Sequence, residues 1–391
     1  MLPVVHSTPV WLPLTQLWMH QLVAGTEGLG PGPISTTVVC EQTRDLDRFP
    51  VADLRVAPPD GAGGRLLRRA RLRRSPPLLA QTLRQRAAET GTPALLHSHF
   101  GDVGWTNRAA ARRAGSPHVV SFYGMDASLL VRKNPRWRRR YPELFASAAR
   151  VVVEGPAMGG TLEALGCPAD KLAVIRIGID TAAVPFEPRS RAAGEPLRVL
   201  LAASFREKKG FPDAVRALGL VARETPVALT IIGDASRDAA SDREKREILT
   251  ALDETGLRAH TRLLGYQPHA TLRAEAYRHH VVLQPSRVAA DGDSEGGSPV
   301  ALTELVATGL IGVGTRHCDI PELLIHGETG RLADEGDVEG LARELRWVAD
   351  HPDAWGGLAR AARHRVEAEY DLAVQCARMA SLYHDVARAA T

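Results

Sequence analysis

The residues best suited to chemistry lie between Asp291 and Gly309 (DGDSEGGSPVALTELVATG), where an acidic, glycine-rich loop leads into a helix. Ser298 and Pro299 indicate where that helix begins, because Ser is a favoured N-cap and Pro a favoured first helical residue. The free backbone N–H groups of a helix start bind anions, and glycines such as Gly296 and Gly297 let a ligand approach the backbone closely. This segment therefore predicts a phosphate-binding site.

Two carboxylates accompany this helix start. Glu295 lies in the loop, and Glu304 lies a little over one turn inside the helix, so both could accept hydrogen bonds from sugar hydroxyls. A solvated acidic loop before an ordinary amphipathic helix has the same pattern. The segment alone does not distinguish these two interpretations.

A basic loop, Ala202–Phe211 (AASFREKKGF), follows the apolar strand RVLLA and precedes another helix. It stands at the carboxyl end of a strand, which is where ligands bind in open α/β sheets. Arg206 can bind phosphate oxygens through its planar fork, and Lys208 and Lys209 supply compact positive charges. The spacing of a Walker loop is absent. Taken alone, the loop favours a charged surface turn.

The elements that must position these loops alternate regularly along the chain. Continuous apolar strands separated by helices are typical of parallel sheets covered on both faces, so the pattern predicts a doubly wound α/β fold. We expect strands at 37–40, 95–100, 119–123, 151–154, 174–177, 199–202, 229–232, 262–264, 281–284 and 311–314. We expect helices at 103–114, 211–224, 243–254, 270–279 and 300–308.

Two such sheets fit the pattern better than one. Residues 181–196 contain three prolines and no helical or strand period, and they predict a linker between two runs of strand–helix units. We therefore expect a first domain over residues 1–180 and a second over residues 197–370. The last segment, 371–391, has the apolar spacing of a single helix.

The composition is that of an ordinary globular protein, with 44% hydrophobic and 24% charged residues. The charge is uneven, because residues 1–190 hold 24 basic and 15 acidic residues (+9), whereas residues 191–391 hold 25 and 30 (−5). The four cysteines are far apart, so the spacings of zinc and C-x-x-C sites are absent. No apolar run approaches the roughly 18 residues of a membrane span. We expect a cytoplasmic protein, either free or peripheral at the inner membrane face.

The basic and acidic loops, in this order and about 90 residues apart, resemble those of the retaining glycosyltransferases of family 4. Further matching pieces are HSHFG at 97–101, SFYGMDAS at 121–128, VIRIGID at 174–180 and RHCDIPELLIHGETGRL at 316–332. The resemblance extends over nearly the whole chain and is strongest to the subgroup from exopolysaccharide and natural-product clusters. It implies the GT-B fold, in which two Rossmann-like domains face each other across a cleft and the last helix crosses back to the first domain.

The resemblance also implies roles for the residues of the acidic loop. In the family, the second glutamate of a pair holds the ribose hydroxyls of the nucleotide, and that position matches Glu304. The first glutamate contacts the donor sugar and matches Glu295, although the eight residues between this pair are one more than usual. The positions that face the sugar and diphosphate match Lys209 of the basic loop and, around the helix start, Gly296, Gly297, Ser298, Pro299 and Val300.

The chain departs from the family at two positions. When KKG is superposed, the family's usual arginine aligns with Ser204, so Arg206, two positions on, is the expected substitute. The H-G-x-D motif, which lies beside the reacting carbon in the family, matches Tyr123-Gly124-Met125-Asp126, with tyrosine in place of histidine. His99 is then the expected nearby imidazole, although His99 and His97 fit buried core histidines equally well.

The implied activity is transfer of a hexose-type sugar from a nucleotide diphosphate donor, such as a UDP- or GDP-sugar, to a hydroxyl acceptor with retention. The resemblance implies no protein nucleophile, no metal and no separate cofactor, because cations of the protein balance the diphosphate charge. Asp291 and Asp293 have the spacing of a metal-binding D-x-D, but they precede a helix of the second domain. The expected acceptor is a polysaccharide, a lipid-linked intermediate or a natural-product intermediate.

Two other functions stay open from the sequence. A nucleotide-sugar epimerase shares the GT-B architecture and would isomerise the donor without an acceptor. Two basic runs, at 65–74 and 131–141, also fit a non-catalytic protein that binds an anionic surface or nucleic acid. We expect no nucleic-acid partner, because no recognised motif is present. In an enzyme, the same runs predict an anionic acceptor or a peripheral membrane contact.

Overall fold

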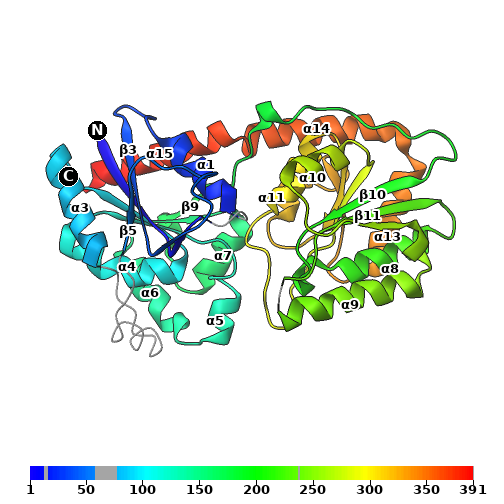
Figure 1. The fold of residues 1–391 in the computed structure, drawn as a ribbon, viewed down its shortest axis with the longest axis horizontal. Coiled ribbons are helices and arrows are strands. Elements are labelled where there is room, and N and C mark those ends of the chain that lie inside the picture. Colours follow the sequence, from blue (N-terminus) through cyan, green and yellow to red (C-terminus); the bar gives the residue numbers. More distant parts are fainter. Residues whose placement is uncertain (13–15, 58–76, 237, 391) are drawn as a thin grey trace. The chain divides into compact units, whose positions relative to one another are not determined.

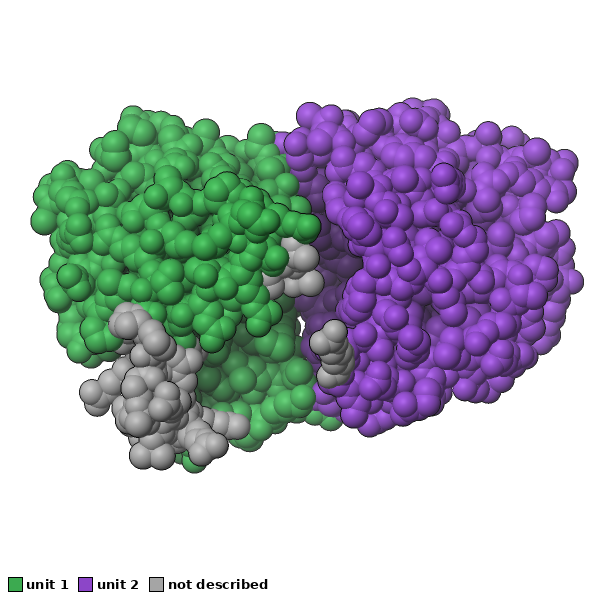
Figure 2. Space-filling view, in the orientation of Figure 1, with its two compact units in different colours: residues 1–178, 372–391 green, residues 179–371 purple. Residues whose placement is uncertain are grey.

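The computed structural model describes residues 1–12, 16–57, 77–236 and 238–390. They form two compact units, which Figure 2 colours separately. Unit 1 contains Met1–Gly178 and Leu372–Thr391, and unit 2 contains Ile179–Asp371. Each unit is built on one parallel sheet, which is the α/β architecture that the alternating pattern predicts. The basic run at 65–74 lies outside the described residues.

The sheet of unit 1 has seven parallel strands in the order β5-β3-β1-β6-β7-β8-β9. Strand β1 pairs with β3 on one side and β6 on the other, so the chain order reverses there, and such switch points open to ligands at the carboxyl ends of the strands. The strands are β1 (Leu2–Ser7), β3 (Ile34–Cys40), β5 (Leu54–Val56), β6 (Leu95–His99), β7 (His118–Ser121), β8 (Arg150–Val153) and β9 (Leu172–Val174). A separate parallel pair joins β2 (Val10–Trp11) to β4 (Gln42–Thr43).

Helices cover both faces of this sheet, because alternate residues of a strand point to opposite sides. Val4 and Leu95 pack in a core layer with α15, whereas Val5 and Leu96 pack in a second layer with α3 and α4. The helices of unit 1 are α1 (Leu17–Thr26), α3 (Pro77–Thr90), α4 (Gly101–Ala114), α5 (Leu129–Lys133), α6 (Trp137–Ser147), α7 (Pro156–Ala164) and α15 (Leu372–Ala389).

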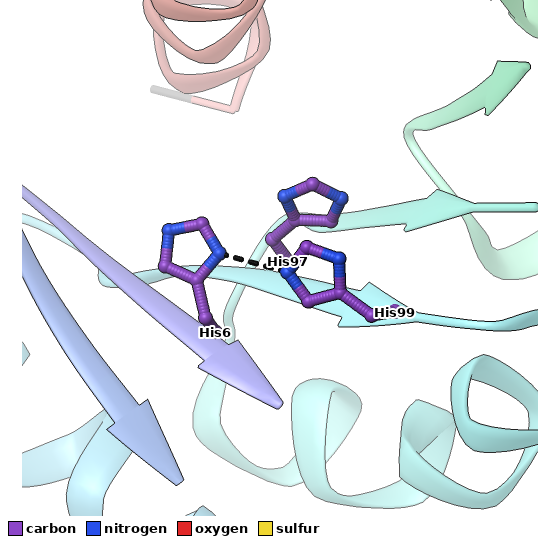
Figure 3. Close-up of side chains that lie close together, drawn as sticks. All are labelled: His6, His97 and His99. Carbon is purple, nitrogen blue, oxygen red and sulfur yellow. Dashed lines mark hydrogen bonds between the residues drawn. The ribbon is translucent and has the colours of Figure 1, made fainter. Parts of the chain in front are cut away.

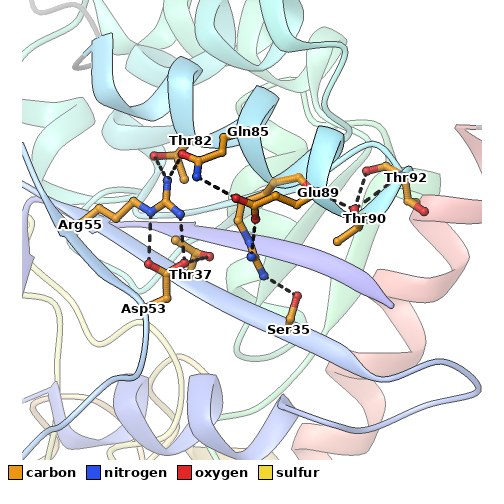
Figure 4. A network of polar contacts seen from close by, with 10 residues as sticks. Ser35, Thr37, Asp53, Arg55, Thr82, Gln85, Glu89, Thr90 and Thr92 are labelled. Carbon is orange, nitrogen blue, oxygen red and sulfur yellow. Dashed lines mark hydrogen bonds and ion pairs between the residues drawn. The ribbon is translucent and has the colours of Figure 1, made fainter.

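A polar network fixes α3 beside the edge of the unit 1 sheet (Figure 4). The Arg55 side chain of β5 donates to Asp53 (Nε–Oδ1, 3.1 Å) and to Gln85 of α3 (Nη1–Oε1, 2.8 Å). Thr37 of β3 donates to the other carboxylate oxygen of Asp53 at 2.7 Å. Charged and hydroxyl groups thus occupy an edge where an apolar strand would invite pairing with other chains.

The sheet of unit 2 has six parallel strands in the order β12-β11-β10-β13-β14-β15. Helices α8, α9 and α13 cover one face, and α10 and α11 cover the other (Figure 1). The strands are β10 (Leu197–Ala202), β11 (Val227–Ile232), β12 (Thr261–Leu263), β13 (Val281–Gln284), β14 (Ile311–Thr315) and β15 (Gly330–Ala333). The helices are α8 (Phe211–Val221), α9 (Ala239–Glu254), α10 (His269–Ala276), α11 (Val300–Ala307), α12 (Ile320–Leu323), α13 (Val338–Asp350) and α14 (Trp355–Glu369).

Two expectations for the chain between the sheets need correction. The strand expected at 174–177 is β9, at 172–174, because its neighbour β8 ends at Val153, the partner of Val174. The segment expected to be a linker, 181–196, lies within unit 2. Arg189 holds it there, since its guanidinium donates to the carbonyl oxygens of His279 (3.1 Å) and Thr308 (3.1 Å).

Helix α15 returns the chain to unit 1 after unit 2 is complete. The hydroxyl of Tyr383 lies 2.5 Å from Nδ1 of His97 in β6, and the amide oxygen of Gln375 accepts the N–H of Arg176 at 2.9 Å. Within the described residues, every helix is too short or too polar to cross a bilayer.

Candidate active site

The basic loop and the acidic loop of unit 2 meet in a buried ion pair. The Nζ atom of Lys209 lies 2.6 Å from Oε1 of Glu295, and Ser286 donates to the same oxygen at 2.9 Å. Burial alone would raise the pKa of Glu295, but the ammonium groups of Lys209 and Lys208 hold it below its usual value. Glu295 is therefore a charged carboxylate with a fixed orientation, although its side chain is only 9% exposed.

The backbone brings these two loops together at one edge of the sheet. Strands β10 and β13 are parallel neighbours, so the loops that follow them leave from the same side. Gly210 ends the basic loop with φ +63°, and a Cβ atom there would lie 2.0 Å from the carbonyl oxygen of Pro285. Only glycine fits this left-handed conformation so close to the carbonyl oxygen of Pro285. The turn at Gly210 therefore determines the position of Lys209, the residue before it.

The three cations of the basic loop do not act together. Lys208 Nζ lies 3.2 Å from Oδ1 of Asp293 and donates to the carbonyl oxygen of Ser294 at 2.9 Å, so it binds the acidic loop beside Lys209. Arg206 pairs instead with Asp238, at 2.9 Å, before the start of α9. Ser204 lies half-buried in the loop just after β10. Lys208, rather than Arg206, is thus the second cation of the acidic loop.

The helix after the acidic loop begins at Val300, as in the expected range 300–308, but one residue after the start that Ser298 and Pro299 indicate. Pro299 is the N-cap of α11, with an extended ψ of 126°, and Val300 is its first helical residue. Ser298 therefore lies too far back to cap the helix, and among the described residues its buried hydroxyl oxygen has no hydrogen-bond partner. Gly296 and Gly297 precede it in the loop. The start of α11 keeps its free N–H groups, which is the feature that binds anions.

Glu304 lies on α11 and is held by two basic groups of α10. Arg273 Nη2 lies 3.0 Å from Oε1 of Glu304, and His269 Nε2 lies 2.6 Å from Oε2. Burial raises the pKa of Glu304, but these partners more than offset it and leave the pKa below its usual value. Glu304 in turn raises the pKa of His269. The carboxylate is therefore charged and fixed in place, and the contact with ribose hydroxyls that the resemblance implies stays a prediction.

In unit 1, Tyr123 and His99 form one polar group at the carboxyl ends of β6 and β7. The Tyr123 hydroxyl lies 2.7 Å from Nδ1 of His99, whose Nε2 lies 3.1 Å from Nδ1 of His6 (Figure 3). The rings of Trp18 and Phe100 pack on Tyr123, with centroids at 4.4 and 5.1 Å. Burial holds the pKa of His99 well below its usual range, so this imidazole is neutral. It serves as a hydrogen-bond partner of the Tyr123 hydroxyl.

Asp126, the last residue of the Tyr123–Asp126 motif, is committed to the backbone. Its carboxylate accepts the N–H groups of Gly101, at 2.7 Å, and Tyr123, at 3.0 Å. Burial raises its pKa to about 6 in spite of these hydrogen bonds. The residue therefore joins the start of α4 to the turn that presents Tyr123, and its expected place beside the reacting carbon stays a prediction.

Three imidazoles of unit 1 lie close enough to share a metal ion. His6, His97 and His99 are fully buried, and each offers a nitrogen within 4.8 Å of the others (Figure 3). Most of these nitrogens already have partners, because His97 lies 2.5 Å from the hydroxyl of Tyr383 and 2.7 Å from that of Ser121. The cluster thus satisfies itself as a hydrogen-bonded group, with only Nε2 of His6 lacking a partner in the described part of the chain.

Comparison with known proteins supplies the family. A family model described as "Glycosyltransferase Family 4" matches residues 27–183, and one described as "Glycosyl transferases group 1" matches residues 185–365. WcaL of Escherichia coli K12, described as a colanic acid biosynthesis glycosyltransferase, is 31% identical over 292 residues, which are 73% of this chain and 69% of WcaL. The chain belongs to glycosyltransferase family 4.

A second glycosyltransferase is similar to the chain over a comparable length. The amylovoran biosynthesis glycosyltransferase AmsK of Erwinia amylovora is 32% identical over 272 residues, which are 69% of this chain and 64% of AmsK. The chain thus spans about two thirds of the length of these relatives. The fold is GT-B, since HepE from Anabaena, solved in complex with UDP, superposes with a TM-score of 0.78 at 16% identity over 98% of this chain and 100% of HepE.

The structure adds contacts that sequence reasoning missed. Ser286 holds Glu295, Lys208 holds the acidic loop, and Arg273 and His269 hold Glu304. Lys208, Arg273 and His269 lie on different strand–helix units from the residues they hold, so no local spacing connects them. Ser286 lies in the same loop as Glu295, nine residues before it, and a polar residue close to the end of a strand was the available signal.

Proposed function

We propose that the enzyme transfers a hexose-type sugar from a nucleoside diphosphate donor to a hydroxyl acceptor, with retention and without a metal. The observation that carries this proposal is the buried Lys209–Glu295 pair, which sets a cation for the diphosphate beside a carboxylate for sugar hydroxyls. The exopolysaccharide relatives support a polysaccharide or lipid-linked acceptor. A HepE structure in complex with UDP-glucose supports a uridine diphosphate donor.

Donor binding would exchange partners within unit 2. In the structure, Lys209 neutralises Glu295, and Lys208 neutralises Asp293. A bound diphosphate would attract the ammonium of Lys209 and the N–H groups at the start of α11, while Glu295 would accept sugar hydroxyls. Glu304 would receive the ribose hydroxyls, with Arg273 and His269 holding its orientation. These preorganised charges would stabilise the leaving group without a metal.

The reaction balances without a protein nucleophile. The bond between the anomeric carbon and the diphosphate oxygen breaks with its electron pair on the diphosphate, and the acceptor oxygen bonds the same face of that carbon. The departing phosphate oxygen takes the acceptor proton. Tyr123, backed by His99, would hydrogen-bond a hydroxyl near that carbon, since a phenol is a poor base near neutrality.

Removal of either charged residue should abolish most turnover. We expect Glu304→Ala and Lys209→Ala each to lower kcat/KM by roughly 10²-fold or more, the scale for losing a charge-stabilising contact. Initial rates with the preferred donor measure this loss, and melting temperatures separate it from unfolding. Glu254→Ala is the matched control, because Glu254 is 54% exposed and pairs only across the surface with Arg216. Near-normal turnover in either site variant refutes the assignment.

A panel of UDP-, GDP- and dTDP-sugars identifies the donor. A donor that binds the folded chain raises its melting temperature through mass action, so one nucleotide should shift the transition and the others should not. Incubation of that donor without acceptor tests the epimerase alternative. An isomerised nucleotide sugar would support the epimerase, whereas slow hydrolysis alone agrees with a transferase.

The acceptor side of the proposal concerns a basic surface of unit 1. Helix α6 buries Trp137, Tyr141 and Phe145 while the cations around its start, Arg132, Lys133, Arg136, Arg138 and Arg139, stay exposed. Arg108 and Arg140 stack on the ring of Trp105, at 4.2 and 4.1 Å, and extend the same kind of surface. We propose that this surface binds an anionic acceptor or the headgroups that carry it.

Sedimentation with vesicles tests this contact. We expect binding to vesicles that contain anionic lipid, weakening as salt rises, because exposed charges are screened over about 10 Å at 0.1 M. The variant R136E/R138E/R139E should lose binding by roughly 10-fold or more. Equal sedimentation with neutral vesicles, or unchanged binding by the variant, contradicts the proposal.

A further inference from the structure

Two consecutive residues that follow β14 hydrogen-bond to the main chain of the acidic loop. The N–H of Glu295 donates to Nε2 of His317 at 3.1 Å, and the thiol of Cys318 donates to the carbonyl oxygen of Glu295 at 3.0 Å. His317 is buried, and Cys318 takes a left-handed φ of +45° that turns its sulfur toward the loop. Both polar groups of the Glu295 main chain are therefore bonded to the chain that follows β14.

A third residue decides which nitrogen of His317 carries the proton. Glu335 Oε1 lies 2.7 Å from Nδ1 of His317, and its Oε2 accepts the N–H of Val288, at the start of the acidic loop, at 2.9 Å. A carboxylate only accepts hydrogen bonds, so Nδ1 must be the protonated nitrogen. The lone pair of Nε2 is then free to accept the N–H of Glu295.

The thiol is fixed as a donor by its surroundings. Burial raises the pKa of Cys318 to about 12, and the carboxylate of Glu295 acts in the same direction. The proton therefore stays on the sulfur, which lies 3.0 Å from the carbonyl oxygen of Glu295 and 3.2 Å from Nε2 of His317. Because Nε2 already accepts the N–H of Glu295, the carbonyl oxygen is the acceptor of the thiol proton. Donor and acceptor roles are thus assigned along the whole path from Glu335 through His317 and Cys318 to Glu295.

We infer that Glu335, His317 and Cys318 are positioning residues that clamp the main chain of Glu295 and so aim its carboxylate. Glu335 sets the imidazole tautomer, and His317 and Cys318 hold the two sides of Glu295. The role in donor binding rests on the proposed function, because it takes Glu295 as the carboxylate that meets the donor sugar. The clamp itself depends only on the geometry of unit 2.

The substitution Glu335→Gln tests the tautomer without changing shape. A glutamine that donates to Nδ1 forces the proton onto Nε2, where it opposes the N–H of Glu295. A glutamine that accepts from Nδ1 turns its NH₂ group against the N–H of Val288. Either arrangement breaks one hold on the loop, as other isosteric acid-to-amide changes beside histidine do.

The first readout needs no substrate. Hydrogen exchange at Glu295, followed in peptides of residues 288–299, should be slow in the wild type and at least 10-fold faster in Glu335→Gln. The ¹⁵N signals of His317 should show a bare Nε2 in the wild type, and in the variant the position of the proton shows which of the two glutamine arrangements forms. Asp334→Asn is the control, because Asp334 is adjacent in sequence but 76% exposed on the surface.

The second readout is turnover, with rescue by a residue of matching hydrogen-bonding ability. His317→Gln keeps one donor and one acceptor and should retain more kcat/KM than His317→Leu, which keeps neither. Glu335→Gln should raise KM for the donor by roughly 10-fold. Unchanged exchange at Glu295 in Glu335→Gln, or a wild-type proton on Nε2, overturns the clamp. Faster exchange with unaltered donor kinetics supports the clamp and instead overturns the donor role proposed for Glu295.

Discussion

The side chain of Asp126, which the sequence motif predicts to lie near the reacting carbon, makes its hydrogen bonds to the main chain. Both of its oxygens accept main-chain N–H groups, and Tyr141 donates to its carbonyl oxygen at 2.7 Å. The residue thereby holds together the start of α4, the turn after β7 and helix α6. Its contribution to activity would pass through the placement of Tyr123.

We expect Asp126→Asn to lower the free energy of unfolding by about 1–3 kcal/mol. Asparagine has one oxygen for two N–H donors, so its NH₂ group would face one of them. Urea unfolding measures the loss, and Asp170→Asn, on an exposed turn, is the control. A variant as stable as the wild type would show that the two hydrogen bonds contribute little.

At the residue scale, the sequence does not predict which contacts the candidate site residues make. The Glu295–Lys209 pair joins residues that are 86 positions apart, and its geometry follows from β10 and β13 being neighbours. Arg206 pairs with Asp238, the N-cap of α9, rather than with an acid of the acidic loop. Which of two acids a surface arginine meets depends on tertiary structure that no local spacing encodes.

The turn at Gly210 is the element on which the basic loop depends. Its left-handed φ costs other residues about 1–2 kcal/mol, and contact with the Pro285 carbonyl adds an overpacking cost of roughly 1–3 kcal/mol. Gly194 has a similar φ of +79° but open space around it. Alanine at Gly194 would therefore add backbone strain alone, whereas alanine at Gly210 would add both backbone strain and a steric clash.

We expect Gly210→Ala to reduce stability by at least twice as much as Gly194→Ala, and to weaken donor binding as well. The loop would have to move away from Pro285, which displaces Lys209 from the acidic loop. Melting temperatures and donor titrations measure the two effects. Equal stability losses in the two variants would mean that the loop yields without cost.

At the element scale, apolar periodicity predicted most of the buried strands. It missed β1 (Leu2–Ser7), which is buried throughout but whose apolar run is broken by Pro3 and His6, and it missed strands that are not apolar. The strand β13 has the expected bounds, 281–284. In contrast, β15 reads Gly-Arg-Leu-Ala, and its pairing depends on the close approach of Gly330 to Gly312, where a Cβ would lie 2.7 Å from the neighbouring oxygen. Such a strand exists because its neighbour is already in place.

Buried histidines give unit 1 a pH-dependent stability. Burial lowers the pKa of His6 and His118 to about 3 and holds those of His97 and His99 well below the usual range. The folded unit keeps these imidazoles neutral, whereas the unfolded chain takes up protons below about pH 6.5. Stability is therefore complete above pH 6.5 and is lost as the pH falls from there toward 3.

We expect each of these histidines to cost roughly 2 kcal/mol of stability at pH 5 relative to pH 7. Urea unfolding, followed by hydrogen exchange in peptides from β6, reports on unit 1 separately from unit 2. His118→Gln should reduce the difference in the free energy of unfolding between pH 7 and pH 5 by about the contribution of one histidine. A pH-independent midpoint between pH 7 and pH 5 would show that the imidazoles become protonated inside the folded unit.

For the whole molecule, the resemblance to family 4 supplied what periodicity could not. Apolar spacing predicts that residues 371–391 form a helix, but not which sheet it covers. In the structure, α15 contributes Met379, Ala380 and Val386 to a core layer of unit 1. The last helix packs on strands from the first part of the chain. Which sheet it covers depends on the apolar surface of the whole folded unit, and a short stretch of sequence does not contain that surface.

The return of α15 sets the order in which the protein can fold during its synthesis. Residues 372–389 leave the ribosome only after all of unit 2, so the nascent unit 1 must wait with part of one face of its sheet uncovered. Unit 2 is continuous in the chain and can fold first. The apolar face of β1 and β6 is then the surface that a chaperone would have to shield until the last helix arrives.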